Sequence, residues 1–373
     1  MAALSRPARV SVRAALPGEG TTVAGLWREL WDAHEAWGGY PGSRDARVYA
    51  QLARRIDDDA RVRAGHPTLG RHVHLVADLA GVPCGQVEGW FERHGGDTTT
   101  PFTCEVRSLI VTARARGLGA GKALLDELAE AAVALSAGAP CVLAAEVLDA
   151  NPATSFYDRL GYVPVSYNAR VDSARPGRVS GQTPVVRSAD RRLAYGETLL
   201  ASVHARVAHA RDALAIACLE GALAARRRDA GDVRFDRPRA VDATMVGAIA
   251  AHLGADEGGP ARDPLTLVSV DQEGVVRAAA SFTTHPLEPP FVPMKRALLG
   301  RFAVDVGPVE ALVTPLVGLA CRLARAQGAP LVELTDLSAP GTPLHDAVLS
   351  AGAAPWSRVV ARYAALAGQP ARG

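Results

Sequence analysis

The sequence predicts a mixed α/β protein of the α+β type, with two domains that each hold a central, mostly antiparallel, twisted sheet flanked by helices. Between residues 72 and 111, strand-like runs follow one another and lead into a glycine-rich loop and a helix. The same order of runs recurs between residues 262 and 363. With 373 residues, 48% hydrophobic and 21% charged, the chain is long enough for two globular domains.

Periodicity and turn residues place the elements of the first half. Helices are expected where apolar residues recur every three or four positions, and strands where they alternate. Gly161 ends the last helix, and Asn151 with Pro152 is a plausible start for it. The expected elements are a strand at 10–15, helices from 22 and from 45 to 62, strands at 72–77, 84–91 and 103–111, a helix ending near 136, a strand at 141–148, a helix ending at 160 and a strand at 162–167.

The glycine-rich loop carries the clearest chemical signal. Three alternating glycines, Gly117, Gly119 and Gly121, join a strand to a helix N-terminus and leave backbone N–H groups free to converge on an anion. Arg116 and Lys122 add positive charge where the helix dipole is already positive. The spacing fits neither the P-loop nor G-x-G-x-x-G, so the loop predicts a phosphate or pyrophosphate site of another kind. The alternative is a tight strand-to-helix turn with no ligand.

Two motifs together resemble one family. The loop reads R-G-x-G-x-G, and residues 151–162 read N-P-A-x-x-F-Y-x-x-L-G-Y. Both resemble signatures of the GNAT superfamily of acyl-CoA-dependent N-acyltransferases, although Asn151 to Tyr157 is one residue shorter than usual. The resemblance covers residues 10–170. It implies an N-acetyltransferase that moves an acetyl group from acetyl-CoA to the primary amine of a small molecule, by direct attack in a ternary complex.

The resemblance also assigns residues to coenzyme A. The loop would hold the pyrophosphate, and the strand before it would pair with the pantetheine arm. The residues implied are Leu109, Ile110, Val111, Arg116, Gly117, Leu118, Gly119, Ala120, Gly121, Lys122, Asn151 and Phe156. The thioester would lie in the splay between strands 103–111 and 141–148.

Tyr157 is implied as the general acid for the departing thiolate, and the alternative is a core aromatic residue. For the base, period two puts Glu105, Arg107, Leu109 and Val111 on one face of their strand. Glu105 then falls where histone-type relatives carry a base. The alternative is an ion pair between Glu105 and Arg107, and Glu146 is a second candidate.

Substrate recognition in the family implies a role for the first helix. Trp27, Trp31 and His34 share one helical face, and Arg107 and Glu146 join them as candidate substrate-binding residues. Tryptophans at helical spacing are also typical of a packed core, and that alternative stays open.

The second half repeats the order but lacks the chemistry. A helical stretch at 193–227 precedes strands at 265–270, 275–283 and 297–304, a helix at 309–326, a strand at 331–337, a helix at 343–350 and a strand at 356–363. Asp305–Val309 replaces the glycine loop, and Val348 stands where Tyr157 would be. We predict a tandem GNAT protein with a catalytic domain at 1–170, a linker at 171–184 and a degenerate domain at 185–373. An unrelated second domain is the alternative.

The composition argues against several classes of function. Lys plus Arg number 41 and Asp plus Glu 39, so the balance argues against nucleic-acid or membrane-surface binding. Five scattered cysteines and no signal-like N-terminus predict a reducing cytoplasm, and no metal-ligand spacing is present. We expect a monomer or homodimer. Other functions left open are a mycothiol-synthase-like enzyme, an aminoacyl-transferring tandem GNAT that uses charged tRNA, and a non-catalytic acyl-CoA sensor.

Overall fold

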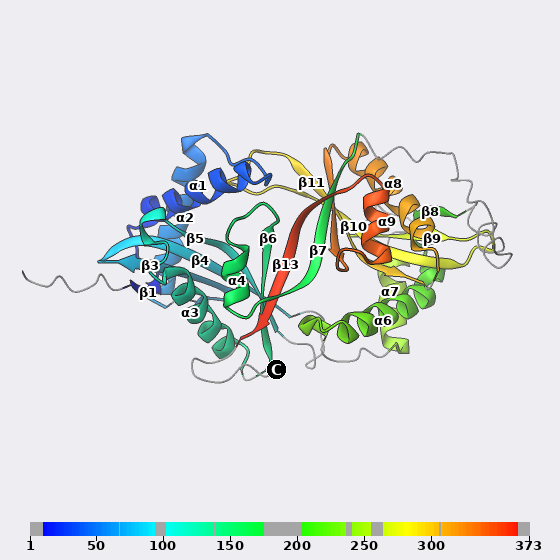
Figure 1. Ribbon diagram of the computed structural model, residues 1–373, viewed down its shortest axis with the longest axis horizontal. Helices are drawn as coiled ribbons and strands as arrows, with labels where there is room; N and C mark the ends of the chain where they lie inside the picture. Colours follow the sequence, from blue (N-terminus) through cyan, green and yellow to red (C-terminus); the bar gives the residue numbers. More distant parts are fainter. Residues whose placement is uncertain are drawn as a thin grey trace, which may run out of the picture. The chain divides into compact units, whose positions relative to one another are not determined.

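A computed structural model of the chain describes residues 10–66, 68–93, 102–137, 139–174, 203–235, 241–254, 264–305 and 307–364 (Figure 1). Its contacts define two compact units. The first unit holds residues 1–164, 288–293 and 359–373, and the second holds 165–287 and 294–358. Two short segments from late in the sequence therefore belong to the first unit. The division into domains at 1–170 and 185–373 stays a prediction.

The first unit is a mixed sheet with helices on both faces (Figure 1). Its strand order is β1-β3-β4-β5-β6, followed by the last part of β13. From β1 to β5 neighbouring strands are antiparallel, and β5 and β6 run parallel. The elements are β1 Val10–Ala14, α1 Gly20–Ala36, α2 Ala46–Arg63, β2 Thr68–Leu69, β3 His72–Leu79, β4 Val82–Arg93, β5 Phe102–Val111, a 3₁₀ turn Ala113–Ala115, α3 Ala120–Leu135, β6 Cys141–Leu148 and α4 Thr154–Arg159.

Alternating side chains of this sheet build two cores. On one face, Leu75 and Val87 pack with Leu124 and Leu128 of α3. On the other face, Val76 packs with α1 and α2. Fully buried leucines such as Leu124 and Leu128 each contribute roughly 1.5–3 kcal/mol of transfer free energy. The strands thus fix the helix face that points inward, and with it the direction in which the α3 N-terminus opens.

The last described strand completes the first unit. Val360 is buried in the core formed with α3, and the Ala364 N–H donates to the Cys141 carbonyl at 2.8 Å. Arg362 donates to the Leu160 carbonyl at 3.0 Å, where α4 ends. In the sequence these residues belong to the second half.

The second unit repeats the element order of the first. Its strand order is β8-β9-β10-β11-β12-β7, followed by the first part of β13, with β11 and β12 parallel. Asn168 of β7 donates to Ser357 Oγ at 3.0 Å. The elements are β7 Val163–Asp172, β8 His204–Val207, 3₁₀ turns Ala210–Asp212 and Val233–Phe235, α6 Ala213–Asp229, α7 Ala243–Gly254, β9 Leu265–Val270, β10 Val276–Pro286, β11 Lys295–Val304, α8 Val309–Ala326, β12 Leu331–Leu337, α9 Pro343–Ser350 and β13 Ala354–Tyr363. This order confirms the predicted mixed α/β class and the internal repeat.

The repeat extends to a backbone irregularity. Ser108 in β5 has a φ of 54° and Arg301 in β11 has a φ of 55°, each three residues before its strand ends. In each pair of strands the register shifts nearby, as a β-bulge requires. A left-handed residue other than glycine inside a strand is uncommon. Its recurrence at the same position therefore supports a tandem fold.

Two expectations about helices were wrong. Within the predicted helical stretch 193–227, residues 193–202 lie outside the described residues, but His204–Val207 form strand β8 and the helix begins only at Ala213. Strand β8 pairs with β9 on its edge, and this tertiary pairing outweighs the local helical pattern. Helix α4 begins at Thr154, later than the Asn151 cap predicts.

Candidate active site

The glycine loop of the first unit presents unpaired backbone donors. Gly117 and Gly119 have φ values of 78° and 84°, and a Cβ at either position would meet no atom within 4 Å. Gly119 caps α3, and no side chain accepts a hydrogen bond in that cap. The carbonyl of Gly119 accepts from Ala123, whereas the first three helical N–H groups have no intrahelical carbonyl to meet. The loop can therefore bind an anion.

Two cations flank the loop. Arg116 is exposed, donates from Nε to the Val111 carbonyl at 3.2 Å, and lies 3.9 Å from Glu29. Lys122 pairs with Asp126 one turn along α3. Leu118, between the glycines, is also exposed. Arg116 and Lys122 can both turn toward a bound phosphate, because exposed ion pairs hold side chains weakly.

An opening between β5 and β6 begins beside the loop. The two strands pair only from Phe102 with Cys141 to Val106 with Ala145, although each continues for several residues. Beyond that point the β5 edge that faces β6 lacks a strand partner, so its backbone groups at residues 107–111 can pair with an extended ligand. Leu109, Ile110 and Val111 line this edge, and Glu146 is the first residue beyond the pairing on β6.

The bulge at Ser108 changes which residues share a face. Leu109 and Val111 pack against the α3 core, together with Val106. Ile110 packs on the opposite face with Leu26 and Leu30 of α1. The expectation that Glu105 and Arg107 share a face with Leu109 and Val111 is wrong, because the extra residue reverses the alternation. Glu105 and Arg107 lie on the α1 face, away from α3.

Tyr157 is the buried residue of α4. Its ring lies 5.3 Å from Phe156 and 5.4 Å from Tyr162, both edge to face. Burial raises the pKa of Tyr157 well above its ordinary value, so the phenol stays protonated at neutral pH. Among the described residues, no hydrogen-bond partner holds its hydroxyl, which leaves this group available to a ligand.

Phe156 connects α4 to the loop. A Cβ on Gly121 would lie 3.0 Å from Cζ of Phe156, which is closer than nearly all real Cβ contacts. Gly121 therefore lets α4, and Tyr157 with it, pack against the first turn of α3. This packing role adds to the anion-binding role that the sequence suggested.

The remaining polar candidates have local partners. Arg107 donates to Glu105 at 2.5 Å, and both side chains are about half exposed. The Asn151 side chain accepts from the Ala153 N–H at 2.9 Å, as in an Asx turn, which explains why α4 starts late. Glu146 is exposed on β6. Glu105 and Glu146 thus flank the opening, and Asn151 shapes the turn that follows β6.

The first helix contributes an aromatic cluster that includes a residue from late in the sequence. Trp27 is buried in the core with α2, and its ring centroid lies 5.7 Å from that of Trp31. Trp31 lies 5.0 Å from His34 and 4.4 Å from Phe291, in the turn between β10 and β11. Burial lowers the pKa of His34 to about 4.

Backbone contacts hold Phe291 in the first unit. The Ser43 N–H donates to the Pro290 carbonyl at 2.6 Å, and the Val292 N–H donates to the Pro41 carbonyl at 3.0 Å. Sequence reasoning missed Phe291, because nothing local in the segment 288–293 links it to residues 27–43.

Comparisons with known proteins agree with this geometry. Residues 27–162 match the family model described as the acetyltransferase (GNAT) family. This part of the chain belongs to the GNAT family. The glycine loop, the opening and Tyr157 therefore lie in an acyl-CoA-dependent N-acyltransferase domain.

Solved structures show that the fold extends over the whole chain. A GCN5-related N-acetyltransferase from Sphaerobacter thermophilus aligns over 99% of this chain and 98% of its own, with 16% identity and a TM-score of 0.50. A glucosamine N-acetyltransferase region of a fungal multi-domain β-N-acetylglucosaminidase aligns over 96% and 38%, with 13% identity and a TM-score of 0.50. A tandem GNAT protein from the clavulanic acid biosynthesis pathway aligns over 96% and 99%, with 16% identity and a TM-score of 0.45. A search of curated protein sequences gives no match.

The second GNAT-like unit lacks the features of the first. Pro308 caps α8 and has no N–H to offer, and Glu310 adds an acid to the first turn. Asp305 pairs with Arg277 at 3.1 Å. Val348, fully buried in α9, stands four residues before Gly352, as Tyr157 stands before Gly161. These residues provide neither an anion site nor a counterpart of the Tyr157 phenol.

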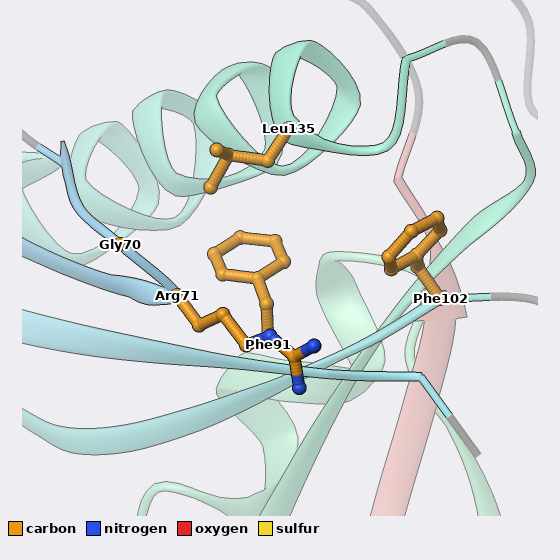
Figure 2. A pocket seen from close by; sticks show the side chains of 5 residues that line it. All are labelled: Gly70, Arg71, Phe91, Phe102 and Leu135. Carbon is orange, nitrogen blue, oxygen red and sulfur yellow. The ribbon is translucent and has the colours of Figure 1, made fainter. Parts of the chain in front are cut away.

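A small pocket of the GNAT domain lies away from these residues. Figure 2 shows it near the end of α3, between two phenylalanine rings and an arginine side chain. Its volume is about 220 Å³, and it is lined by Gly70, Arg71, Phe91, Phe102 and Leu135. Leu135 stands roughly 22 Å along the helix from Ala120, at 1.5 Å per residue. The pocket therefore does not belong to the candidate active site.

Neither a metal site nor a membrane span was found in the described parts of the chain. Within those residues, no group of three or more His, Cys, Asp or Glu could hold a metal ion. No described helix is long and apolar enough to cross a bilayer.

Proposed function

We propose that the first unit transfers an acetyl group from acetyl-CoA to the primary amine of a small molecule, by direct attack within a ternary complex. One observation carries this proposal. A loop with unpaired N–H donors, an unpaired strand edge and a protonated phenol occur in one unit, joined by the contact between Phe156 and Gly121. In acetyl-CoA, the pyrophosphate would bind the N–H donors of the loop, the pantetheine amides would pair with the strand edge, and the sulfur would receive the proton of the phenol.

In this proposal the loop from Arg116 to Lys122 holds the pyrophosphate, and residues 109–111 pair with the pantetheine. Coenzyme A supplies an activated thioester when bound. An N–H on the unpaired edge of β5 would polarise the thioester carbonyl, and Tyr157 would donate its proton to the departing sulfur. A raised pKa suits this task, since the phenol reaches the reaction still protonated.

The acceptor would enter from the α1 face. Trp31, His34 and Phe291 present partly exposed rings there, and Glu105 and Arg107 lie on the same face of β5. Aromatic rings bind the apolar or ring-shaped body of a small molecule, and a carboxylate attracts its ammonium group. An amino sugar, an antibiotic or a biosynthetic intermediate fits this description. Glu105 stays a candidate for the proton acceptor.

The test is to incubate the protein with acetyl-CoA and a panel of small amines while following free thiol, with mass spectrometry of the amines. We expect thiol release that depends on one class of amine, and a mass increase of one acetyl group in that amine. Binding of coenzyme A is measured in parallel by calorimetry. Binding without turnover of any amine would favour a non-catalytic acyl-CoA sensor over the proposed enzyme.

A further inference from the structure

A buried carboxylate that the sequence motifs do not include lies on β4, the neighbour of the strand that borders the opening. Glu88 is on β4, 7% exposed, on the sheet face that α1 and α2 cover. His72 Nε2 lies 3.1 Å from one of its oxygens, and Ser108 Oγ donates to the other at 3.2 Å. A carboxylate this buried is rare in proteins unless it is paired or hydrogen-bonded.

The contact with Arg63 determines which ring nitrogen of His72 faces Glu88 as a donor. Arg63 Nη2 lies 2.7 Å from His72 Nδ1, and an arginine nitrogen can only donate. Nδ1 is therefore the acceptor, so Nε2 carries the hydrogen and donates it to Glu88. Trp90 stacks on the imidazole with centroids 4.4 Å apart, which holds the ring plane in place. Glu88 thus accepts one hydrogen bond from a histidine whose ring is held in place.

Ser108 places the second donor at the opening. It is the left-handed residue of the bulge, and it stands two residues after Val106, the last residue of β5 that pairs with β6. Its hydroxyl proton points to Glu88, so the Ser108 oxygen can only accept from any further partner. An amine that reaches the opening is such a partner.

Glu88 is ionised and can therefore accept a proton. Burial acts to raise the pKa of Glu88, but the hydrogen bonds from His72 and Ser108 oppose this, and the pKa lies below its ordinary value. The carboxylate is therefore ionised at neutral pH. The ammonium group that forms on attack is far more acidic than an ordinary alkylammonium ion, because the carbon to which its nitrogen is now bonded also carries oxygen and sulfur.

Resting on the proposed function, we infer that Glu88 receives the proton of the acceptor amine through the hydroxyl of Ser108. As the amine nitrogen bonds to the thioester carbon, its proton passes to Ser108 Oγ and the hydroxyl proton of Ser108 passes to Glu88. The carbon–sulfur bond then breaks, and the thiolate takes a proton from Tyr157. Solvent returns the proton of Glu88 to Tyr157, so amine and thioester give amide and thiol.

Glu105 is the rival for this role. Its carboxylate is about half exposed and bonded to Arg107 at 2.5 Å. Glu88 is hydrogen-bonded to Ser108, which stands two residues beyond the last β5 residue that pairs with β6, whereas Glu105 lies within the paired part of β5 and is bonded to Arg107.

The experiment compares variants in the thiol-release assay, with the amine that the wild-type protein acetylates best. We expect Glu88→Gln and Ser108→Ala each to lower kcat by about 100-fold, within the usual range for general base catalysis. The dissociation constant for coenzyme A should change less than about twofold. The double variant should lose little more than either single one, because both interrupt one relay.

Two further variants separate chemistry from folding. Ser108→Gly suits the left-handed backbone but lacks the hydroxyl, so it should lose as much kcat as Ser108→Ala. Glu92→Gln makes the same change at an exposed site of the same strand and should keep wild-type kcat.

The inference is overturned if Glu88→Gln stays within about threefold of wild-type kcat, if Ser108→Gly is as active as wild type, or if Glu105→Gln loses more than Glu88→Gln. In each of these cases the wild-type enzyme still acetylates an amine, so the proposed function survives. If the wild-type protein acetylates no amine, both fail together.

Discussion

Replacement of Gly119 by alanine tests the anion-binding loop. Its φ of 84° is strained for an L-residue, and an added Cβ meets no protein atom within 4 Å. The change should therefore lower the free energy of unfolding by roughly 1–2 kcal/mol, from backbone strain alone. For a unit of this size that corresponds to about 2–8 °C in Tm. The methyl group would also occupy open space beside the α3 N–H groups.

Gly65→Ala is the matched control. Gly65 follows α2, has a φ of 86°, and likewise has open space within 4 Å of the position that a Cβ would take. Both variants should lose similar Tm by scanning fluorimetry. Only Gly119→Ala should weaken coenzyme A binding in calorimetry, by about tenfold or more. Equal dissociation constants in Gly119→Ala and Gly65→Ala would refute the assignment of the loop to the pyrophosphate.

Three more predictions concern single side chains. Tyr157→Phe keeps the packed ring, so coenzyme A binding should stay within about twofold while kcat in the thiol-release assay falls by about 100-fold; unchanged kcat would remove Tyr157 from the mechanism. Phe291→Ala should raise KM for the amine several-fold and leave the dissociation constant of coenzyme A unchanged, and a loss confined to coenzyme A binding would contradict the placement of the acceptor. Burial lowers the pKa of His34 from 6.5 to about 4. The stability that this group contributes is therefore complete above pH 6.5 and is lost as pH falls through about 4, with an upper limit of about 3.4 kcal/mol. Urea titrations at several pH values measure the loss, and His34→Gln should make the free energy of unfolding less pH-dependent.

The order of elements could be predicted from the sequence because it depends on local patterns. Alternation in β3 to β5 and the helical spacing after Gly121 are visible within short windows. The glycine loop was also visible, since its three alternate glycines join a strand-like run to a helical one, and the second motif favoured an anion site over a plain turn. The family then followed from two motifs whose separation one helix and one strand explain.

The faces of β5 could not be predicted because one backbone angle sets them. Nothing in the letters around Ser108 marks it as left-handed, and serine has no special preference for that region. Once the bulge is present, side chains before it and after it exchange faces. Glu105 and Arg107 consequently lie on the α1 face, and a buried carboxylate on the neighbouring strand gains access to Ser108.

Contacts between residues far apart in the chain also could not be predicted from the sequence. Glu88 and His72 look like ordinary polar positions of two strands, and only pairing of β3 with β4 brings them together. Phe291 lies in a hairpin turn rich in proline, where an aromatic residue carries no signal of its partner. Such contacts depend on register and on which unit a segment joins.

Strand β13 affects how the protein can be made. Domains usually fold in order as they leave the ribosome. Here the core of the first unit contains Val360, and its α4 is held by Arg362. The first unit therefore cannot finish folding until residues 359–364 have been synthesised, long after its other strands. A shortened chain that stops at residue 170 would lack the strand that follows β6 in this sheet. A nascent chain must keep that edge of β6 unpaired until residues 359–364 have been made.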